Sequence, residues 1–317
     1  MTQISRRSLF GAAAAASVLP VAGGLAAFSP IAAAAAAPKK ARTIVEIAAM
    51  SPVDMARESD VVQTSYEIIR AAAGRLRDPE LRKAVLSIIE NPAPTIASAD
   101  QSAVLAALKK EGLIAAGRTS VFPKFSDTTR SPQPTWSAPG SGYGSHHAYP
   151  GGLCTHVALN VVSAESLVAA YNNIDGLKLD LDHAVGGEIL HDLHKPWVFQ
   201  WEADNACRKE EALAGTGEHH VLSIAESIKR GLPAEFVVAQ ACAHEHPGSA
   251  SGEAQVVGWL RAAAIIAGVD PVKAGRRRQD PAAAAPHRGL GRTPRRPRLG
   301  HLRARLPVGR QGPSKPR

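Results

Sequence analysis

The residues best suited to chemistry in this sequence are histidines, and one of them stands directly before an aspartate. His191 and Asp192 follow an apolar run and precede the basic residue Lys195. A neutral imidazole nitrogen beside an anionic carboxylate oxygen suits a divalent metal ion of hard to borderline character. Burying both groups together without a partner is unfavourable, whereas a divalent cation satisfies both. The pair therefore predicts a metal site at the end of a helix.

More histidines lie in other segments that have the apolar spacing of helices. His156 comes three residues after Leu153 and three before Leu159, so it faces inward on a helix expected over about 153–171. A lone inward histidine is more often a satisfied core residue than a ligand. The His-Asp pair changes that balance, because separate helices can bring several ligands to one ion. The later candidates are His219, His220, His244 and His246.

The order of these motifs resembles the HD-domain family of metal-dependent phosphohydrolases. The segments HHAYPGGLCTH, at 146–156, and ILHDLHK, at 189–195, carry the resemblance, which covers about residues 145–270. The family implies an all-α fold, here an HD-domain-like helical bundle with an N-terminal helical preface. It also implies one or two divalent ions of Mn, Fe, Co, Ni or Zn. The metal ligands implied by the resemblance are His156, His191, Asp192, His220, His244 with His246 as the near alternative, and Asp270.

Two of these ligands depend on alignment with the family pattern. Matching a later Ala-Glu pair to a similar pair in the family puts His220 at the ligand position and His219 outside it. Asp270 is matched to the last aspartate of the family, because it ends the apolar helix expected over 257–269. The expected site therefore includes His220 but not His219, and its last carboxylate is Asp270 at the end of a helix.

The resemblance also implies residues for catalysis and for substrate binding. Lys195 stands where related enzymes place a basic residue against the substrate phosphate. His194 replaces the usual glycine, and is interpreted as an acid–base group, a partner behind the ligands or a local variant. Trp197 is either a core anchor or a wall on which a base stacks. The catalytic candidates are Asp192, Lys195 and His194, and the substrate-binding candidates are Lys195, His146, His147 and Trp197.

The predicted function is hydrolysis of a small phosphorylated substrate, a nucleotide-like phosphate ester. A divalent metal lowers the pKa of bound water towards neutrality, so that hydroxide is available to attack phosphorus. The metal and Lys195 would neutralise charge on the phosphoryl oxygens. Two alternatives stay open. One is a di-iron oxygenase of a related helical branch that uses similar ligands, and the other is a degenerate HD module that binds a ligand or metal in the periplasm.

Helices are the elements expected to position these residues. Aromatic residues make up only 4% of the chain, and the abundance of alanine favours close-packed helices. A helical preface is expected over 38–117, with apolar spacing over 43–50, 54–77 and 79–90. Residues 118–150 form a long loop that leads into the site, a placement that favours a functional role. The HD-like metal-binding domain is expected over 151–275.

The N-terminal segment has the features of an export signal. Arg6 and Arg7 precede an Ala-rich apolar stretch and a run of small residues that ends at Ala37. This order resembles a twin-arginine signal over 1–37, which implies a periplasmic or secreted protein and the twin-arginine export machinery as a partner. Pro20 and Pro30 interrupt the apolar run, so it is too short for a membrane span.

Charge and cysteine content limit the remaining possibilities. The formal charge of +9 arises in residues 276–317, which hold 13 of the 37 Lys and Arg residues but only one of the 28 acidic residues. The rest of the chain is mildly acidic, so no specific nucleic-acid partner is expected. The tail is either a basic, disordered arm or the product of a shifted reading frame. The three cysteines are too few and too scattered for a disulfide framework or a zinc motif.

Overall fold

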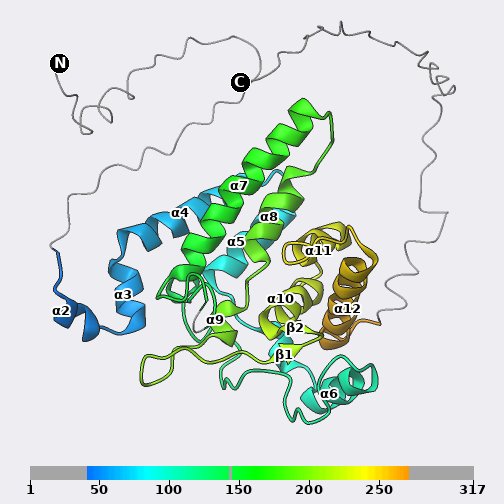
Figure 1. Ribbon diagram of the computed structural model, residues 1–317, viewed down its shortest axis with the longest axis horizontal. Helices are drawn as coiled ribbons and strands as arrows, with labels where there is room; N and C mark the ends of the chain where they lie inside the picture. The colour runs from blue at the N-terminus through cyan, green and yellow to red at the C-terminus, as the bar shows by residue number, and fades with distance from the viewer. Residues whose placement is uncertain (1–40, 143–144, 271–317) are drawn as a thin grey trace, which may run out of the picture. The chain divides into compact units, whose positions relative to one another are not determined.

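The computed structural model describes residues 41–142 and 145–270, and the secondary structure there is almost entirely helical (Figure 1). This confirms the expected all-α fold. The α-helices, in chain order, are α2 (Ile44–Ala48), α3 (Pro52–Glu58), α4 (Asp60–Gly74), α5 (Pro79–Glu90), α6 (Gln101–Lys110), α7 (Gly152–Ile174), α8 (Leu181–Leu190), α9 (Lys195–Val198), α10 (Glu218–Lys229), α11 (Ala234–Ala241) and α12 (Ala250–Ala267). The other elements are the 3-10 turns η1 (Thr95–Ser98) and η2 (Thr135–Ser137), and an antiparallel hairpin of β1 (Ala212–Leu213) and β2 (Thr216–Gly217). The expected export signal over 1–37 and the basic tail over 276–317 lie outside the described residues.

Side-chain caps set helix boundaries in the first part of the chain. Asp78 accepts hydrogen bonds from backbone N–H groups of the first turn of α5, and Pro79 occupies that turn, so α5 begins where the sequence predicts. The helix expected over 54–77 is divided into α3 and α4. Ser59 has an extended backbone between them, and its side chain caps α4. The capping serine therefore overrides the continuous apolar spacing.

Asp180 caps α8, because its side chain accepts a hydrogen bond from the His183 N–H. Asp182 is buried, and accepts hydrogen bonds from the backbone N–H groups of Arg77 at 2.7 Å and Asp78 at 2.8 Å. It joins the turn between α4 and α5 to α8. This contact helps to position the helix that carries the His-Asp pair.

The helices pack around two clusters of buried apolar side chains. The first cluster joins α4, α5, α7 and α8, and Phe236 of α11 also belongs to it. The second joins α6, α10 and α12 through side chains that include Leu108, Leu222 and Trp259. The described part of the expected preface, residues 41–117, is therefore shared between the two clusters, since α4 and α5 contribute to the first and α6 contributes to the second.

Helix α7 carries one candidate ligand and extends beyond its neighbours at its C-terminal end (Figure 1). Its inner face packs on α4 and α8, while Leu159, Val162 and Leu167 are exposed. Its length and apolar composition would also suffice to cross a membrane, a property shared by core helices of soluble proteins. The packing on α4 and α8 directs His156 towards the end of α8.

A buried carboxylate ties the second cluster to the first part of the chain. Glu226 of α10 is fully buried, and accepts hydrogen bonds from the Thr95 hydroxyl at 2.7 Å and the Ile96 N–H at 3.1 Å. Arg230 and His194 approach the same carboxylate at 2.7 Å and 3.2 Å. Burial alone would raise the pKa of Glu226, but the hydrogen bond and charge of His194, with the other donors, lower it to about 2. Glu226 is therefore ionised and fully buried, and its hydrogen bonds join α10 to η1.

We predict that Glu226→Ala lowers the free energy of unfolding by about 3–5 kcal/mol, because several buried donors lose their partner. The folded-state pKa of Glu226 lies below its ordinary value of 4.5. Its contribution is therefore complete above that value and is lost as the pH falls towards 2. Urea unfolding at a series of pH values measures both effects, with Glu67→Ala on the exposed face of α4 as the control. Equal stability of Glu226→Ala and the wild type at pH 7 would contradict this role.

Candidate metal centre

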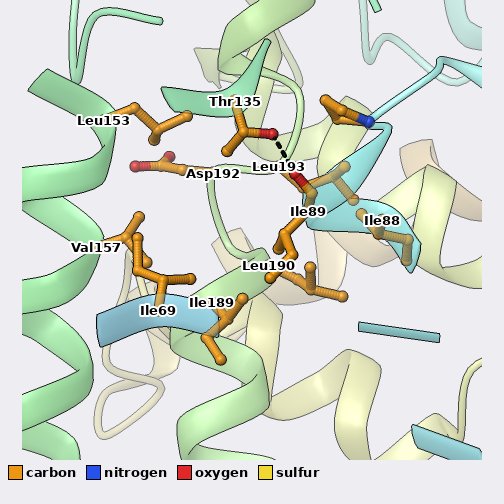
Figure 2. Close-up of a pocket in the computed structure, with 11 residues that line it drawn as sticks. Ile69, Ile88, Ile89, Thr135, Leu153, Val157, Ile189, Leu190, Asp192 and Leu193 are labelled. Atoms are coloured by element: carbon orange, nitrogen blue, oxygen red, sulfur yellow. Dashed lines mark hydrogen bonds between the residues drawn. The ribbon is translucent and has the colours of Figure 1, made fainter. Parts of the chain in front are cut away.

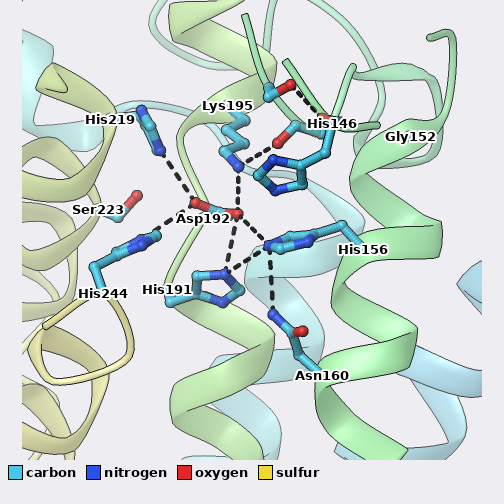
Figure 3. Close-up of polar contacts among 12 residues, drawn as sticks. His146, Gly152, His156, Asn160, His191, Asp192, Lys195, His219, Ser223 and His244 are labelled. Carbon is cyan, nitrogen blue, oxygen red and sulfur yellow. Dashed lines mark hydrogen bonds and ion pairs between the residues drawn. The ribbon is translucent and has the colours of Figure 1, made fainter. Parts of the chain in front are cut away.

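The His-Asp pair lies at the end of α8, with the carboxylate of Asp192 at the centre of a group of imidazoles (Figure 3). Asp192 is buried, with 1% of its surface exposed. His191 Nδ1 lies 2.6 Å from the Glu188 carbonyl oxygen, and its Nε2 lies 3.0 Å from Asp192 Oδ2. A hydrogen bond to a carbonyl fixes Nδ1 as the protonated nitrogen, which leaves Nε2 free to bind a metal.

One side of the site comes from α7. His156 Nε2 lies 3.3 Å from Asp192 Oδ2 and 3.3 Å from His191 Nε2. Asn160, one turn later on α7, places its amide nitrogen 3.3 Å from the same His156 nitrogen. Ligand atoms of His156, His191 and Asp192 all lie within 4.8 Å of one another. Two histidines that lie 35 residues apart in the sequence thus converge on one carboxylate.

The other side of the site comes from the first turn of α10 and the segment after α11. His219 Nε2 and His244 Nε2 lie 3.3 Å and 3.4 Å from Asp192 Oδ1. The ring of His220 stacks on that of His244, with 3.4 Å between centroids. Ligand atoms of these three histidines and Asp192 again lie within 4.8 Å of one another. Asp192 therefore belongs to both groups and offers one oxygen to each.

The structure brings both adjacent histidines of α10 to the site, although the sequence placed only His220 there. His219 Nδ1 lies 2.6 Å from Glu210 Oε2, so a carboxylate holds this ring with Nε2 towards Asp192. Metal-bound histidines commonly have such a carboxylate partner on the other nitrogen. The short spacing between Glu210 and His219 in the sequence could have indicated this contact. The contact forms, however, only because the hairpin of β1 and β2 folds the intervening residues back.

The charge states suit metal binding. Burial, together with the neighbouring His219 and His244, lowers the pKa of His220, and burial lowers that of His244 to about 4 against the opposing effect of Asp192. Both rings are therefore neutral at pH 7 and offer a lone pair. Burial would raise the pKa of Asp192, but His191 and the Lys195 ammonium beside it hold that pKa well below its ordinary value. Neutral nitrogen donors around an ionised carboxylate form a donor set that suits divalent transition metals.

The hydrogen bonding of the carboxylate gives an independent test of that fit. The carboxylate of Asp192 and the Nε2 atom of His244 are buried, and no hydrogen bond of good geometry reaches them, although Lys195 Nζ lies 2.5 Å and His191 Nε2 lies 3.0 Å from Asp192 Oδ2. Buried polar atoms of this kind are unfavourable unless another group satisfies them. A divalent cation between the carboxylate and the imidazoles would do so. The residues therefore fit a metal centre that the two groups of side chains sharing Asp192 would hold.

Lys195 contributes a buried positive charge to the same site. Its Nζ atom lies 2.5 Å from Asp192 Oδ2 and also donates to the carbonyl oxygen of Gly140. The side chain is 3% exposed. These contacts orient the ammonium group beside the ligand cluster.

Four histidines of the ligand cluster line a cavity of about 590 Å³, namely His156, His219, His220 and His244. Its wall also includes His146, Lys195, Phe199 and Lys209. This volume falls within the usual range for small-molecule sites, and two lysines give it positive charge. Asp192 also lines a second, apolar cavity of about 20 Å³ between α4, α5, α7 and α8 (Figure 2). That space holds about one water molecule, so only the larger cavity can take a substrate.

Four of the sequence candidates lie away from the cluster. His194 is buried and faces Glu226, with 3.2 Å between Nε2 and Oε2. Trp197 is fully buried against His194, so its ring has no face towards the cavity. His246 and Asp270 are exposed, and neither belongs to any of the groups of ligand atoms found among the described residues. His146 and His147 do lie close to His156.

Comparison with known proteins gives a partial match. The dihydroneopterin 2',3'-cyclic phosphate phosphodiesterase of Methanocaldococcus jannaschii is 27% identical over 180 residues, which is 54% of this chain and 56% of that enzyme. The chain thus matches about half the length of this curated relative. No protein-family model matches the chain. No solved structure matches it either. The chain is therefore similar to a phosphodiesterase over a region of domain size.

We predict that removal of divalent metal by a chelator lowers the melting temperature, and that Mn²⁺ restores it. A ligand present at about a hundred times its Kd stabilises the folded state by about 2.7 kcal/mol. Asp192→Asn should abolish this response, because Asp192 belongs to both groups of ligand atoms. Asp175→Asn, an exposed position after α7, is the matched control. A full Mn²⁺ response in Asp192→Asn would contradict the assignment of this carboxylate.

Proposed function

We propose that the protein is a metal-dependent phosphohydrolase of HD type that hydrolyses a small phosphate ester, with a nucleotide-like diester as the substrate class. The observation that carries this proposal is the position of Asp192. It is shared by two groups of imidazoles beside a cavity of about 590 Å³ that Lys195 also lines. The similarity to a cyclic phosphate phosphodiesterase supports a diester in particular.

The residues of the cluster have distinct roles in this proposal. His156, His191 and Asp192 would hold one divalent ion, and His219, His220 and His244 would hold a second that shares Asp192. Bound metal supplies a water nucleophile at neutral pH and neutralises phosphoryl charge. Glu210 keeps His219 oriented through its contact with Nδ1.

The two lysines of the cavity would bind the phosphate. Lys195 is fixed by Gly140 and Asp192, so its ammonium group needs no rearrangement to neutralise a phosphoryl oxygen. Lys209 lines the same cavity, and would meet the leaving part of a diester or a second charged group. Phe199 contributes the apolar surface of the wall. The site thus combines metal ligands, phosphate-binding cations and a surface for the organic part of the substrate.

We predict that the protein loaded with Mn²⁺ hydrolyses bis(p-nitrophenyl) phosphate or a 2',3'-cyclic nucleotide. Asp192→Asn should reduce turnover below detection, while Lys195→Ala should lower kcat/KM by about a hundredfold or more, the usual effect of removing one transition-state contact. Asp175→Asn serves as the control.

Each alternative function gives a different result in that experiment. Retained hydrolysis in Asp192→Asn would refute the mechanism. Substrate-dependent oxygen consumption by the iron-loaded protein, without ester hydrolysis, would identify an oxygenase. Metal binding with neither reaction, under all loadings, would identify a binding module. These readouts separate the three hypotheses that the sequence left open.

We also propose that the protein is exported by the twin-arginine route to the periplasm or the medium. The support is the order of features in residues 1–37, with Arg6 and Arg7 before an apolar stretch. The combined substitutions Arg6→Lys and Arg7→Lys should retain the protein in the cytoplasm, as cell fractionation measures. The control variant carries Lys39→Arg and Lys40→Arg, and its export should be unchanged. Equal export of both variants would contradict the proposal.

A further inference from the structure

One imidazole beside the metal centre has no role in the proposed function so far. His147 lies in the loop before α7, and its ligand atom is within 4.8 Å of those of His146 and His156. His156 also belongs to the group formed with His191 and Asp192. The groups of ligand atoms therefore form a continuous series that extends from Asp192, through His156, to the loop.

The backbone of this loop is built to place His147 close to α7. His147 has a φ of 56°, a left-handed conformation that residues other than glycine rarely adopt and that often marks functional sites. The Gly140 N–H donates a 2.8 Å hydrogen bond to the His147 carbonyl oxygen. A Cβ atom at Gly140 would lie 2.7 Å from His147 Cβ, and one at Gly152 would lie 1.9 Å from the His147 oxygen. Glycine at both positions is thus required for this close approach.

The side chain that is held in this way lacks a partner for one nitrogen. His147 Nδ1 is buried and has no hydrogen bond. Its ring centroid lies 5.4 Å from that of His156. His146 differs, since it is exposed and its Nδ1 lies 3.2 Å from the Ser145 hydroxyl. A buried nitrogen without a partner is unfavourable, and a cation shared with His156 would satisfy it.

The ligand set of the first ion has room for such a donor. His156, His191 and Asp192 supply three ligands, whereas divalent transition metals take at least four. Helix α12 contributes no residue to any of the groups of ligand atoms among the described residues, and Asp270 lies exposed beyond it. A neutral imidazole has one lone-pair nitrogen, so His156 can bind only one ion at a time. His147 therefore extends the first site rather than forming a separate one.

We propose that His147 is a further protein ligand of the ion held by His156, His191 and Asp192. The ion is then bound by three imidazoles and one carboxylate, and the loop before α7 closes that side of its coordination sphere. Such a nitrogen-rich set discriminates in favour of Zn, Fe, Co or Ni and against Mg or Ca. This inference rests on the metal centre described above, and not on the reaction that it performs.

Titration of the metal-free protein with Co²⁺ tests the assignment, because visible absorption of bound Co²⁺ reports its ligands and geometry. In His147→Asn, which removes the imidazole but keeps a residue that tolerates the left-handed backbone, Co²⁺ should bind at least about tenfold more weakly with an altered spectrum. His147→Gly, which relieves the backbone, should show the same loss. His183→Asn, which removes an imidazole of α8 outside the cluster, is the control.

A further variant keeps the His147 side chain and tests whether its position matters for metal binding. Gly140→Ala keeps every ligand but places a methyl group against His147 Cβ, so it should weaken Co²⁺ binding in the same direction. Wild-type affinity and spectrum in both His147→Asn and His147→Gly would overturn the proposal. A raised KM for a phosphodiester with unchanged Co²⁺ binding would also overturn it, by making His147 a substrate contact. Absence of any phosphodiesterase activity would refute the proposed function alone, because the Co²⁺ spectrum does not depend on turnover.

Discussion

The structure depends on one buried carboxylate that has positive charge and neutral nitrogen around it. Asp192 is almost fully buried, and among the described residues Lys195 is the permanent cation that contacts it, at 2.5 Å from Oδ2. An isolated ion in such a position would be strongly unfavourable. The imidazoles directed at both oxygens make sense as ligands of metal ions that supply the missing charge. A bound cation would thus serve both the stability of the buried carboxylate and the chemistry of the site.

The two apolar clusters explain how ligands distant in sequence reach Asp192. The first cluster positions α7 and α8, which carry His156 and His191. The second positions α10 and α11, which lead to His219 and His244. Asp192 lies where the chain leaves α8 for α9, and so passes from one cluster to the other. The geometry of the site therefore depends on the packing of both clusters.

Much of this arrangement could be predicted from the sequence, because apolar spacing identifies helices and their inward faces. The resemblance to the HD-domain pattern then implied that His156, His191 and His244 lie beside Asp192, and the structure brings them together. The sequence does not give the rotation of α10 about its own axis at its first turn. His219 and His220 both reach the cluster for that reason, although alignment chose only one.

Other residues depend on partners that local spacing does not reveal. His194 seemed available for acid–base chemistry, but it faces Glu226, which is distant in sequence and also holds η1. Trp197 is enclosed by the second cluster instead of forming a wall of the cavity. Asp270 follows the end of α12, where the helix no longer directs a side chain to the site. In each case, tertiary packing decided a question that the sequence left open.

The most direct measurement of the central idea is an anomalous difference map from crystals soaked in Mn²⁺. The account predicts a peak within bonding distance of the Asp192 carboxylate, of His156 and of His191, and a second peak, where two ions bind, on the side of His219 and His244. Peaks that contact none of these side chains, or an Asp192 carboxylate with no ion at saturating Mn²⁺, would contradict it.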